Sequence, residues 1–383
     1  MSLCLPVQIV PETILFLARS LNRGGAERQM VVLAKGLVGR GHVVAVAVFF
    51  GGGVYENELT EAGVRVLNLG KQGRWDILPF LHRLVHLLRM ERPAVLHSYL
   101  GVPNILAAAL KPLLSGTRIV WGVRASNVDL SCYDSLSRLV YALERRLARF
   151  ADLIIANSKA GKHYAVANGF PEDKIVVIPN GIDTEYFQFD PEGRRQVRAE
   201  WGINEKKILV GLVGRLDPMK DHPTFLEAAS RITCERHDVN FVCVGGGSAE
   251  YAEVLKQRAA ALGLTNQLIW VAARDDMPAV YSALDITVSS SCSEGFSNTI
   301  AEAMACGVPC VVTDVGDSAL IVGDVGSVVS SADPSVLAVA VGHLIDLPAE
   351  DLRVLGEACR ARVVSEFGID RLVQRTEQVL DLV

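Results

Sequence analysis

The sequence predicts an α/β fold of two doubly wound domains, each a parallel sheet covered by helices, that face a cleft. Three observations lead to this prediction. Short apolar runs of strand length alternate with amphipathic helical segments through most of the 383 residues, as they do in βαβ units. The segment 181–193 follows neither periodicity and separates two such series. The net charge changes sign at about the same place.

The first series is expected to form one sheet. Its strands are predicted at 13–17, 43–50, 64–67, 94–97, 118–121, 153–156 and 175–178, and its helices at 26–40, 77–91, 135–150 and 158–168. The second series is expected to form another sheet. Its strands are predicted at 207–213, 240–244, 268–271, 286–289 and 308–312, and its helices at 223–236, 249–262, 277–283, 298–305, 335–345, 351–365 and 370–382.

Composition excludes several classes of protein. Half of the residues are hydrophobic and 21% are charged, which is not the composition of a disordered or fibrous chain. The longest uninterrupted apolar run, 43–50, is far shorter than the ~20 residues of a membrane-spanning helix, and no signal-peptide pattern opens the sequence. The eight cysteines form no C-x-x-C pair, as expected for free thiols in a reducing compartment. We therefore expect a cytoplasmic protein.

Glycine-rich stretches follow several predicted strands, at 24–25, 51–53, 245–247 and Gly295. None matches the G-x-G-x-x-G fingerprint or a Walker A motif. Tight turns would explain any one of them. Together they indicate backbone N–H groups directed at an anion.

Two cations lie five residues apart on the loop that leaves the first strand of the second series. They are Arg215 and Lys220, and Pro218 and Pro223 keep this loop from becoming helical. A guanidinium and a mobile ammonium suit a diphosphate, the first through bidentate bonds and the second as a point charge. The alternative is a solvated surface loop.

Two carboxylates flank a predicted helix start. Glu294 lies in a loop, Gly295 permits close backbone approach, Ser297 or Asn298 is expected to cap the helix, and Glu302 lies about one turn into it. Both carboxylates can line one pocket beside a helix N-terminus, which attracts phosphate. The alternative is a capping arrangement with one surface glutamate.

These motifs resemble the signature of retaining GT-B glycosyltransferases of the family 4 type. The resemblance rests on motifs that fall in the family's order and span nearly the whole chain. They are Gly-Gly-Ala-Glu at 24–27, Ala-Asn-Ser-Lys at 156–159, Ile-Pro-Asn-Gly-Ile-Asp at 178–183, Gly-Arg-Leu-Asp-Pro-Met-Lys-Asp at 214–221, and the E-x7-E pair Glu294 and Glu302.

The resemblance implies a GT-B fold with three parts. Residues 1–184 would form an acceptor-side Rossmann-like domain and 185–365 a donor-binding domain, while 366–383 would be a C-terminal helix packing back toward the N-terminal domain. It also implies a UDP- or GDP-sugar as co-substrate, no resident cofactor and no metal, in line with the absence of a D-x-D motif.

The resemblance further implies roles for single residues. Arg215 and Lys220 would hold the donor diphosphate, Glu294 the donor sugar and Glu302 the ribose. We expect Arg215, Lys220 and Glu294 to be the catalytic set. The remaining donor contacts implied are Gly25 capping the phosphates, Gly246 and Arg274 near the nucleobase, and the backbone at Phe296, Ser297, Asn298 and Thr299.

One position departs from the family pattern. Arg124 stands where many relatives have a histidine, and an arginine cannot accept a proton at neutral pH. It could instead bind the donor phosphate or an anionic acceptor. His97 matches another family position, with a hydrogen-bonded core histidine as the alternative.

The resulting expectation is a retaining hexosyl-type transferase that moves a sugar to a hydroxyl acceptor during polysaccharide or glycolipid assembly. Two rivals stay open: a GT-B sugar-nucleotide epimerase, and a non-catalytic sugar-nucleotide-binding partner in a larger assembly. The acceptor is expected to be lipid-linked or a polysaccharide, and no nucleic acid partner is expected. The sequence leaves open the sugar, the base, the acceptor and the oligomeric state.

The charge split adds one further expectation. Up to Asp183 the chain has 21 Lys+Arg and 14 Asp+Glu, a net +7, and beyond it 17 and 29, a net −12. Basic residues gather on two apolar-striped helices and predict peripheral contact with an anionic membrane. They are Arg74, Arg83, Arg89 and Arg92 on one, and Arg138, Arg145, Arg146 and Arg149 on the other. The alternative is crossover helices with solvated arginines and core-facing leucines.

Overall fold

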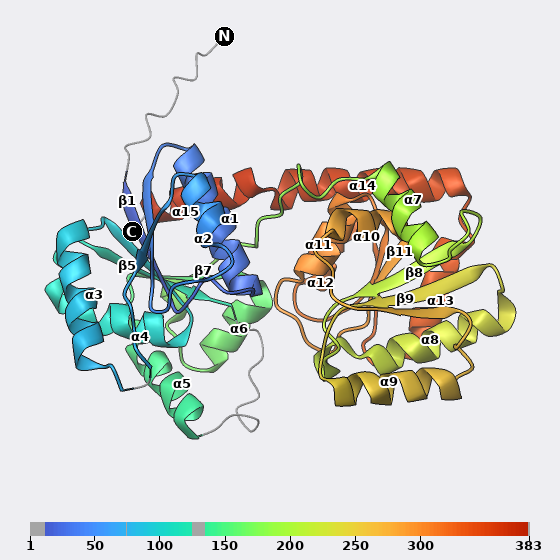
Figure 1. Ribbon diagram of the computed structural model, residues 1–383, viewed down its shortest axis with the longest axis horizontal. Helices are drawn as coiled ribbons and strands as arrows, with labels where there is room; N and C mark the ends of the chain where they lie inside the picture. The colour runs from blue at the N-terminus through green and yellow to red at the C-terminus, as the bar shows by residue number, and fades with distance from the viewer. Residues whose placement is uncertain (1–11, 74, 125–134, 382–383) are drawn as a thin grey trace, which may run out of the picture. The chain divides into compact units, whose positions relative to one another are not determined.

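The computed structural model describes residues 12–73, 75–124 and 135–381 (Figure 1). The chain divides into two compact units. The N-terminal unit holds the described residues up to Asn157, Gly161–Gly181 and those from Leu372 onward, and the C-terminal unit holds Ser158–Ala160 and Ile182–Arg371. The main boundary therefore falls at 181/182, inside the segment that the sequence marks as a linker.

The N-terminal unit is built on a seven-stranded sheet in the order β3-β2-β1-β4-β5-β6-β7, with every strand pair parallel. Each strand overlaps one predicted from the sequence. The strands are β1 (Thr13–Ala18), β2 (Val43–Val48), β3 (Arg65–Asn68), β4 (Val95–Tyr99), β5 (Arg118–Val123), β6 (Leu153–Ala156) and β7 (Ile175–Val177).

Helices cover both faces of this sheet (Figure 1). They are α1 (Gly25–Gly39), α2 (Glu56–Glu61), α3 (Leu78–Glu91), α4 (Gly101–Leu110), α5 (Ser135–Leu147), α6 (Lys159–Ala167) and the last helix α15 (Ile369–Asp381). The sequence analysis missed α2 and α4. The chain end is tied to this unit by Glu377, which lies 3.0 Å from the His42 ring, and by the Leu380 carbonyl, which accepts from Arg118.

The C-terminal unit has a six-stranded parallel sheet in the order β10-β9-β8-β11-β12-β13. Five strands were predicted and β13 was missed, because three residues carry almost no periodicity. The strands are β8 (Ile208–Val213), β9 (Val239–Val244), β10 (Leu268–Val271), β11 (Ile286–Ser289), β12 (Cys310–Thr313) and β13 (Ser327–Val329). The strand order reverses between β8 and β11, where such sheets place their ligands at the carboxyl ends.

The helices of the C-terminal unit begin and end close to the predicted positions, apart from α7 and α12, which the sequence analysis missed. They are α7 (Pro191–Glu200), α8 (His222–Glu235), α9 (Ala249–Ala261), α10 (Met277–Ala283), α11 (Asn298–Ala305), α12 (Ser318–Val322), α13 (Pro334–Ile345) and α14 (Ala349–Phe367).

Successive residues of the central strands are buried on opposite faces of the sheet. Leu209 packs into one core cluster, and its neighbour Val210 packs into another. This explains why the strands read as continuous apolar runs rather than alternating ones.

Two wider expectations can be compared with the described residues. Of their six free cysteines, Cys234 and Cys292 are exposed, and the other four are buried; Cys4 and Cys132 lie outside the described ranges. None of the described helices is both long and apolar enough to span a membrane.

Candidate functional site

The loops that follow β8 and β9 pack against each other at the carboxyl edge of the C-terminal sheet. Gly214 N donates to Val244 O at 2.9 Å, and Leu216 N donates to Gly246 O at 2.8 Å. A Cβ on Gly245 would lie 1.9 Å from the Gly214 carbonyl oxygen, and one on Gly247 would lie 2.4 Å from that of Leu216. The close packing of these two loops therefore requires glycine at both 245 and 247.

Gly246 differs from its two neighbours. A Cβ there would meet only the Ala273 Cβ, at 3.9 Å. Among the described residues, no neighbouring atom therefore requires a glycine at this position. The open space in front of it is where the resemblance puts the nucleobase.

The loop after β8 is shaped by prolines and aspartates. Pro218–Lys220 form a single 3-10 turn, in which the Asp217 side chain accepts from Met219 N at 2.9 Å. Asp221 has φ +46 and caps α8, accepting from Thr224 N at 3.3 Å and from its hydroxyl at 2.6 Å. Lys220 thus leaves a rigid turn just before a helix.

Lys220 forms an ion pair with Glu294, whose Oε1 also accepts from the Ser291 hydroxyl at 2.7 Å. The two side chains are only 17% and 10% exposed. Ser290 supports the same turn, because its hydroxyl donates to the Lys220 and Asp221 carbonyls at 2.9 and 3.0 Å. A cation and a carboxylate held this way form a pre-arranged polar cluster.

Arg215 lies on the same loop but outside that cluster. Its side chain is 73% exposed, and its guanidinium lies 3.6 Å from the Asp217 carboxylate. The sequence analysis placed both cations on one loop, and the structure adds that one is packed while the other is presented to solvent.

Glu302 lies in α11, as predicted. The fully buried Tyr281 donates its hydroxyl to Glu302 Oε2 at 2.8 Å. Burial and the Glu302 charge raise the pKa of Tyr281 well above its usual value, so the phenol stays a donor. No motif in the sequence points to Tyr281, which lies 21 residues before Glu302 on α10.

The start of α11 differs from the prediction in one respect. Ser297 occupies the N-cap position, one of the two expected, but its side chain makes no capping hydrogen bond. The Ser297 hydroxyl instead lies 3.2 Å from that of Thr299. Phe296 packs against Phe367 in the core with ring centroids 5.4 Å apart, which leaves only its backbone for a ligand.

The close approach expected at Gly295 depends on Gly316 as well. Gly316 has φ +60, and a Cβ there would lie 2.3 Å from Glu294 O and 2.8 Å from Gly295 O. Asp317 N donates to Gly295 O at 3.0 Å. The loop after β12 thereby supports the loop that carries Glu294.

Arg274 is engaged on both edges of its guanidinium. It binds Glu200 at 2.6 and 2.8 Å and Asp276 at 2.8 and 2.7 Å. These bonds raise the pKa of Arg274. Any contact with a nucleobase would therefore use the guanidinium face or the backbone.

His222, next to the Lys220 turn, is fully buried, and neither ring nitrogen has a hydrogen-bond partner among the described residues. Burial and the Lys220 charge lower the pKa of His222 to about 4. The ring is therefore neutral at pH 7.

The carboxyl edge of the N-terminal sheet carries Arg124, directly after β5. Its guanidinium donates to Asn180 Oδ1 and, at 3.0 Å, to the Tyr99 hydroxyl, and it lies 5.1 Å from the Tyr99 ring centroid. His97 beside Tyr99 is 1% exposed, and burial followed by the Arg124 charge lowers its pKa to about 3. His97 is thus a neutral core histidine, but its Nε2 has no hydrogen-bond partner among the described residues, so the alternative interpretation holds for burial and not for hydrogen bonding at that atom.

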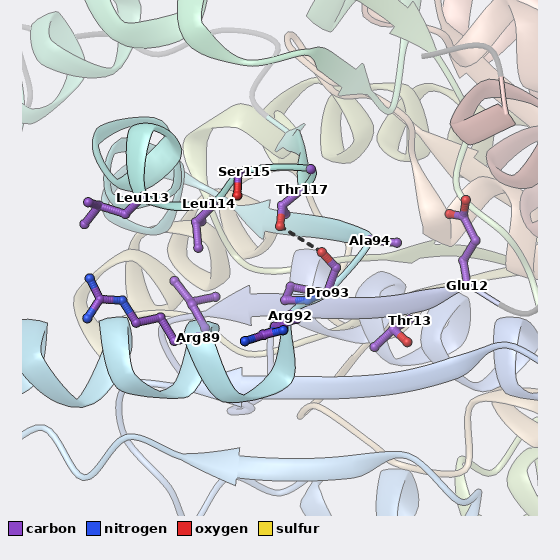
Figure 2. A pocket seen from close by; sticks show the side chains of 12 residues that line it. Glu12, Thr13, Arg89, Arg92, Pro93, Ala94, Leu113, Leu114, Ser115 and Thr117 are labelled. Carbon is purple, nitrogen blue, oxygen red and sulfur yellow. Dashed lines mark hydrogen bonds between the residues drawn. The ribbon is translucent and has the colours of Figure 1, made fainter.

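Two cavities mark opposite edges of the N-terminal sheet. One of about 370 Å³ lies at the carboxyl edge, lined by Arg19, Glu27, Tyr99, Leu100 and Val140 among others. Another of about 680 Å³ lies at the amino edge, beside Arg89 and Arg92 (Figure 2). There Thr117 donates to Pro93 O at 2.8 Å. None of the expected site residues lines the second cavity, so cavity volume does not locate the site. Gly25, the first residue of α1, lines neither cavity.

No group of three or more His, Cys, Asp or Glu side chains within the described ranges could hold a metal ion. The arrangement at the C-terminal edge instead offers two cations, two oriented carboxylates and the backbone N–H groups of a helix start. Such a set can bind a phosphate-containing ligand that also carries hydroxyl groups.

Comparison with known proteins gives the class of this fold first. The crystal structure of Anabaena Alr3699/HepE in complex with UDP superposes with a TM-score of 0.83 at 23% identity, over 97% of this chain and all of that one. WaaG, a glycosyltransferase involved in lipopolysaccharide biosynthesis, superposes with a TM-score of 0.70 at 17% identity, over 96% and 99%. The fold is GT-B.

Family models then match most of the chain. The model for Glycosyltransferase Family 4 matches 23–186, and that for Glycosyl transferases group 1 matches 207–346. The chain belongs to the family 4 type of GT-B glycosyltransferases.

Curated relatives agree with this assignment. The lipopolysaccharide core biosynthesis mannosyltransferase LpsB of Rhizobium meliloti is 31% identical over 52% of this chain and 57% of its own length. An Escherichia coli UDP-Gal:alpha-D-GlcNAc-diphosphoundecaprenol alpha-1,3-galactosyltransferase is 27% identical over 78% and 77%. The chain matches only 51–57% of the length of the first three relatives.

Proposed function

We propose that this protein is a retaining glycosyltransferase that moves a sugar from a nucleoside diphosphate to a hydroxyl acceptor in polysaccharide or glycolipid assembly. The observation that carries the proposal is the cluster at the carboxyl edge of β8 and β11. There Lys220, Glu294 and Ser291 are hydrogen-bonded together beside the exposed Arg215 and the start of α11.

The donor diphosphate would lie between the two cations and the first turn of α11. Lys220 and Arg215 supply two positive charges, and the helix start adds N–H donors without an intrahelical partner. These groups stabilise the negative charge that develops on the leaving phosphate as the glycosidic bond breaks.

The two carboxylates would bind hydroxyl groups at the two ends of the donor. Glu294 is held by Lys220 and Ser291 through Oε1, and its second oxygen can accept from the sugar. Tyr281 orients Glu302 from inside the core, which fits a carboxylate that accepts from the ribose hydroxyls. Bonds of this kind, with one charged partner, contribute ~1.5–3 kcal/mol each.

The acceptor hydroxyl would react on the face from which the phosphate departs, with that phosphate taking up the proton. The chain's contribution is then to position the reactants and stabilise charge. Arg124 would bind a phosphate or an anionic acceptor, and Gly25 would approach the phosphates through its backbone. Gly246 and Arg274 would lie near the base.

The relatives support this proposal without fixing the substrate. Their names include a mannosyltransferase and a galactosyltransferase that uses UDP-Gal, and HepE structures hold UDP and UDP-glucose. UDP- and GDP-sugars are therefore the donors to test.

Release of nucleoside diphosphate separates this function from its two rivals. Purified protein should release UDP or GDP from one donor of a panel, and faster when an extract that contains acceptors is added. A sugar-nucleotide epimerase would convert the donor without acceptor dependence, and a binding partner would leave it intact. Either of these results would refute the proposal.

A further inference from the structure

Helix α5 of the N-terminal unit exposes three leucines and buries its glutamate, while its last leucine, Leu147, packs against the core. Leu136, Leu139 and Leu143 are 46%, 63% and 42% exposed, whereas Glu144 is only 8% exposed. The leucines are spaced by three and four residues, so they form one stripe. An ordinary surface helix has the opposite arrangement.

Hydrogen bonds explain why the glutamate faces inward. Glu144 Oε1 accepts from the Asn104 side chain of α4 at 2.8 Å, and Asn104 in turn accepts from the Ser98 hydroxyl of β4 at 2.8 Å. The buried carboxylate is thereby satisfied. This network fixes the rotation of α5 about its axis and leaves the leucine stripe on the surface.

Arginines border the leucine stripe. Arg145, Arg146 and Arg149 line a groove of about 590 Å³ together with Leu139 and Leu143. None of the three forms an ion pair with a carboxylate in the described part of the chain, and Arg149 lies 4.9 Å from the ring centroid of Phe150, which is also exposed. We call these leucines and arginines the α5 face.

Helix α3, the other basic helix, is built differently. Phe80, Leu84 and Leu88 are buried in the core. Arg83 pairs with Asp76 at 2.5 Å and donates to Leu69 O at 2.7 Å. Leu78 and Met90, near its two ends, are 79% and 70% exposed, but between them α3 is a crossover helix with core-facing apolar residues, as the alternative in the sequence analysis held. Arg74 lies outside the described residues.

The chemistry of the α5 face selects among partners. In a symmetric dimer the same patch would meet itself, and the arginines of the two copies would repel each other. An anionic bilayer would instead neutralise the arginines and bury the leucines at the boundary between headgroups and acyl chains. We propose that the α5 face docks the protein on an anionic lipid surface.

The docked helix also borders the cavity at the carboxyl edge of the N-terminal sheet, since Val140 of α5 lines it with Leu100 and Tyr99. If the proposed function holds, on which this step rests, the cavity would open beside the lipid surface. An acceptor anchored in that surface by a lipid chain would then be the substrate class. The docking itself does not depend on this step.

Vesicle sedimentation tests the docking directly. At low salt the protein should sediment with mixed phosphatidylcholine–phosphatidylglycerol vesicles but not with vesicles of phosphatidylcholine alone. It should be released at ~0.5 M salt, because the Debye length there is only a few ångströms. Arg145→Glu with Arg146→Glu should weaken binding by about 30-fold or more, taking each basic residue as ~1 kcal/mol.

The control is Arg89→Glu with Arg92→Glu, an equal charge change at the exposed end of α3 (Figure 2). It should reduce binding by less than about threefold, since those residues lie outside the α5 face. Leu139→Ser with Leu143→Ser should also weaken binding while leaving the melting temperature unchanged.

Three results would overturn the docking: no binding of the wild type to anionic vesicles, equal loss in the two arginine pairs, or full binding by the leucine variant. A concentration-dependent dimer lost in the leucine variant would assign the face to a second copy instead. Nucleoside diphosphate affinity, measured on the same samples, reports separately on the proposed function.

Discussion

The carboxyl edges of the two sheets are equipped with different chemistry. In the C-terminal unit the edge holds charged groups bound to one another: Lys220 with Glu294, and Glu302 with Tyr281. In the N-terminal unit it holds Arg124 against Tyr99, next to the buried neutral His97, and Arg19 and Glu27 line the cavity there. The first edge is suited to a charged, polyhydroxylated ligand, and the second places charged groups beside a cavity that is also lined by apolar residues such as Leu100 and Val140. The same fold can thus present two chemically different edges, because side chains on loops decide the difference.

The largest effect is expected at the C-terminal edge. Lys220→Ala should lower kcat/KM for the donor by ~2–4 kcal/mol, the range for removing one pre-arranged electrostatic donor. Arg215→Ala should lower kcat/KM for the donor by about the same amount. The matched control is Lys206→Ala, an exposed lysine at the opposite end of β8, which should leave kinetics unchanged. Equal activity of Lys220→Ala and Lys206→Ala would remove the functional contrast between the edges.

Arg124 tests the N-terminal edge. Arg124→Ala should lower kcat/KM by ~1.5–3 kcal/mol, as expected for losing hydrogen bonds that involve a charged group. Tyr99→Phe, which removes one hydrogen bond and keeps the ring beneath the guanidinium, should cost only ~0.5–1.5 kcal/mol. If Arg124→Lys retained full activity, the planar guanidinium would be irrelevant and this account of the edge would be wrong.

Acid should destabilise both units through one buried histidine each. The pKa values of His97 and His222 are lowered to about 3 and about 4, so the unfolded chain binds more protons than the folded one below pH ~6.5. Stability is therefore lost as the pH falls through this range, by ~2 kcal/mol per histidine between pH 7 and 5. In denaturant unfolding, the His97→Asn and His222→Asn variants should each lose correspondingly less unfolding free energy than the wild type between pH 7 and 5. An unchanged loss in both would mean that neither ring is buried neutral.

The two carboxylates of the C-terminal edge should be separable, with a smaller effect. Glu302→Gln should weaken the binding of free nucleoside diphosphate about tenfold, because the charged acceptor of the hydrogen bonds from the ribose hydroxyls is lost. Glu294→Gln should leave nucleotide affinity within about twofold and reduce turnover instead. Calorimetric titration with UDP and GDP measures the first effect. Equal loss of affinity in both variants would contradict the separate roles.

The sequence predicted most of the fold because its strands are buried on both faces and read as continuous apolar runs. It missed α2, which buries only Leu59, and α4, which is preceded by Leu100 in an unusual conformation with φ +65. It also missed α7, although Asp190 and Pro191 are typical start residues and Asp190 accepts from Gly193 N at 2.9 Å.

The site residues that form charged motifs in the sequence were predicted. The residues that hold them in place from elsewhere in the fold were missed. Ser291 was overlooked within a serine run, Tyr281 lies on another helix, and Gly316 acts from the loop after β12. The leucine stripe of α5 was recognised, but periodicity alone does not tell which face is covered. That depends on Asn104, 40 residues before Glu144.

The configuration of the transferred sugar tests the central claim most directly. Rapid NMR observation of donor consumption, with water or an added acceptor, should show first-formed product with the donor's own anomeric configuration and one nucleoside diphosphate released per sugar. The same spectra should show almost no product for Lys220→Ala. An inverted first product, or equal turnover by that variant, would contradict the account.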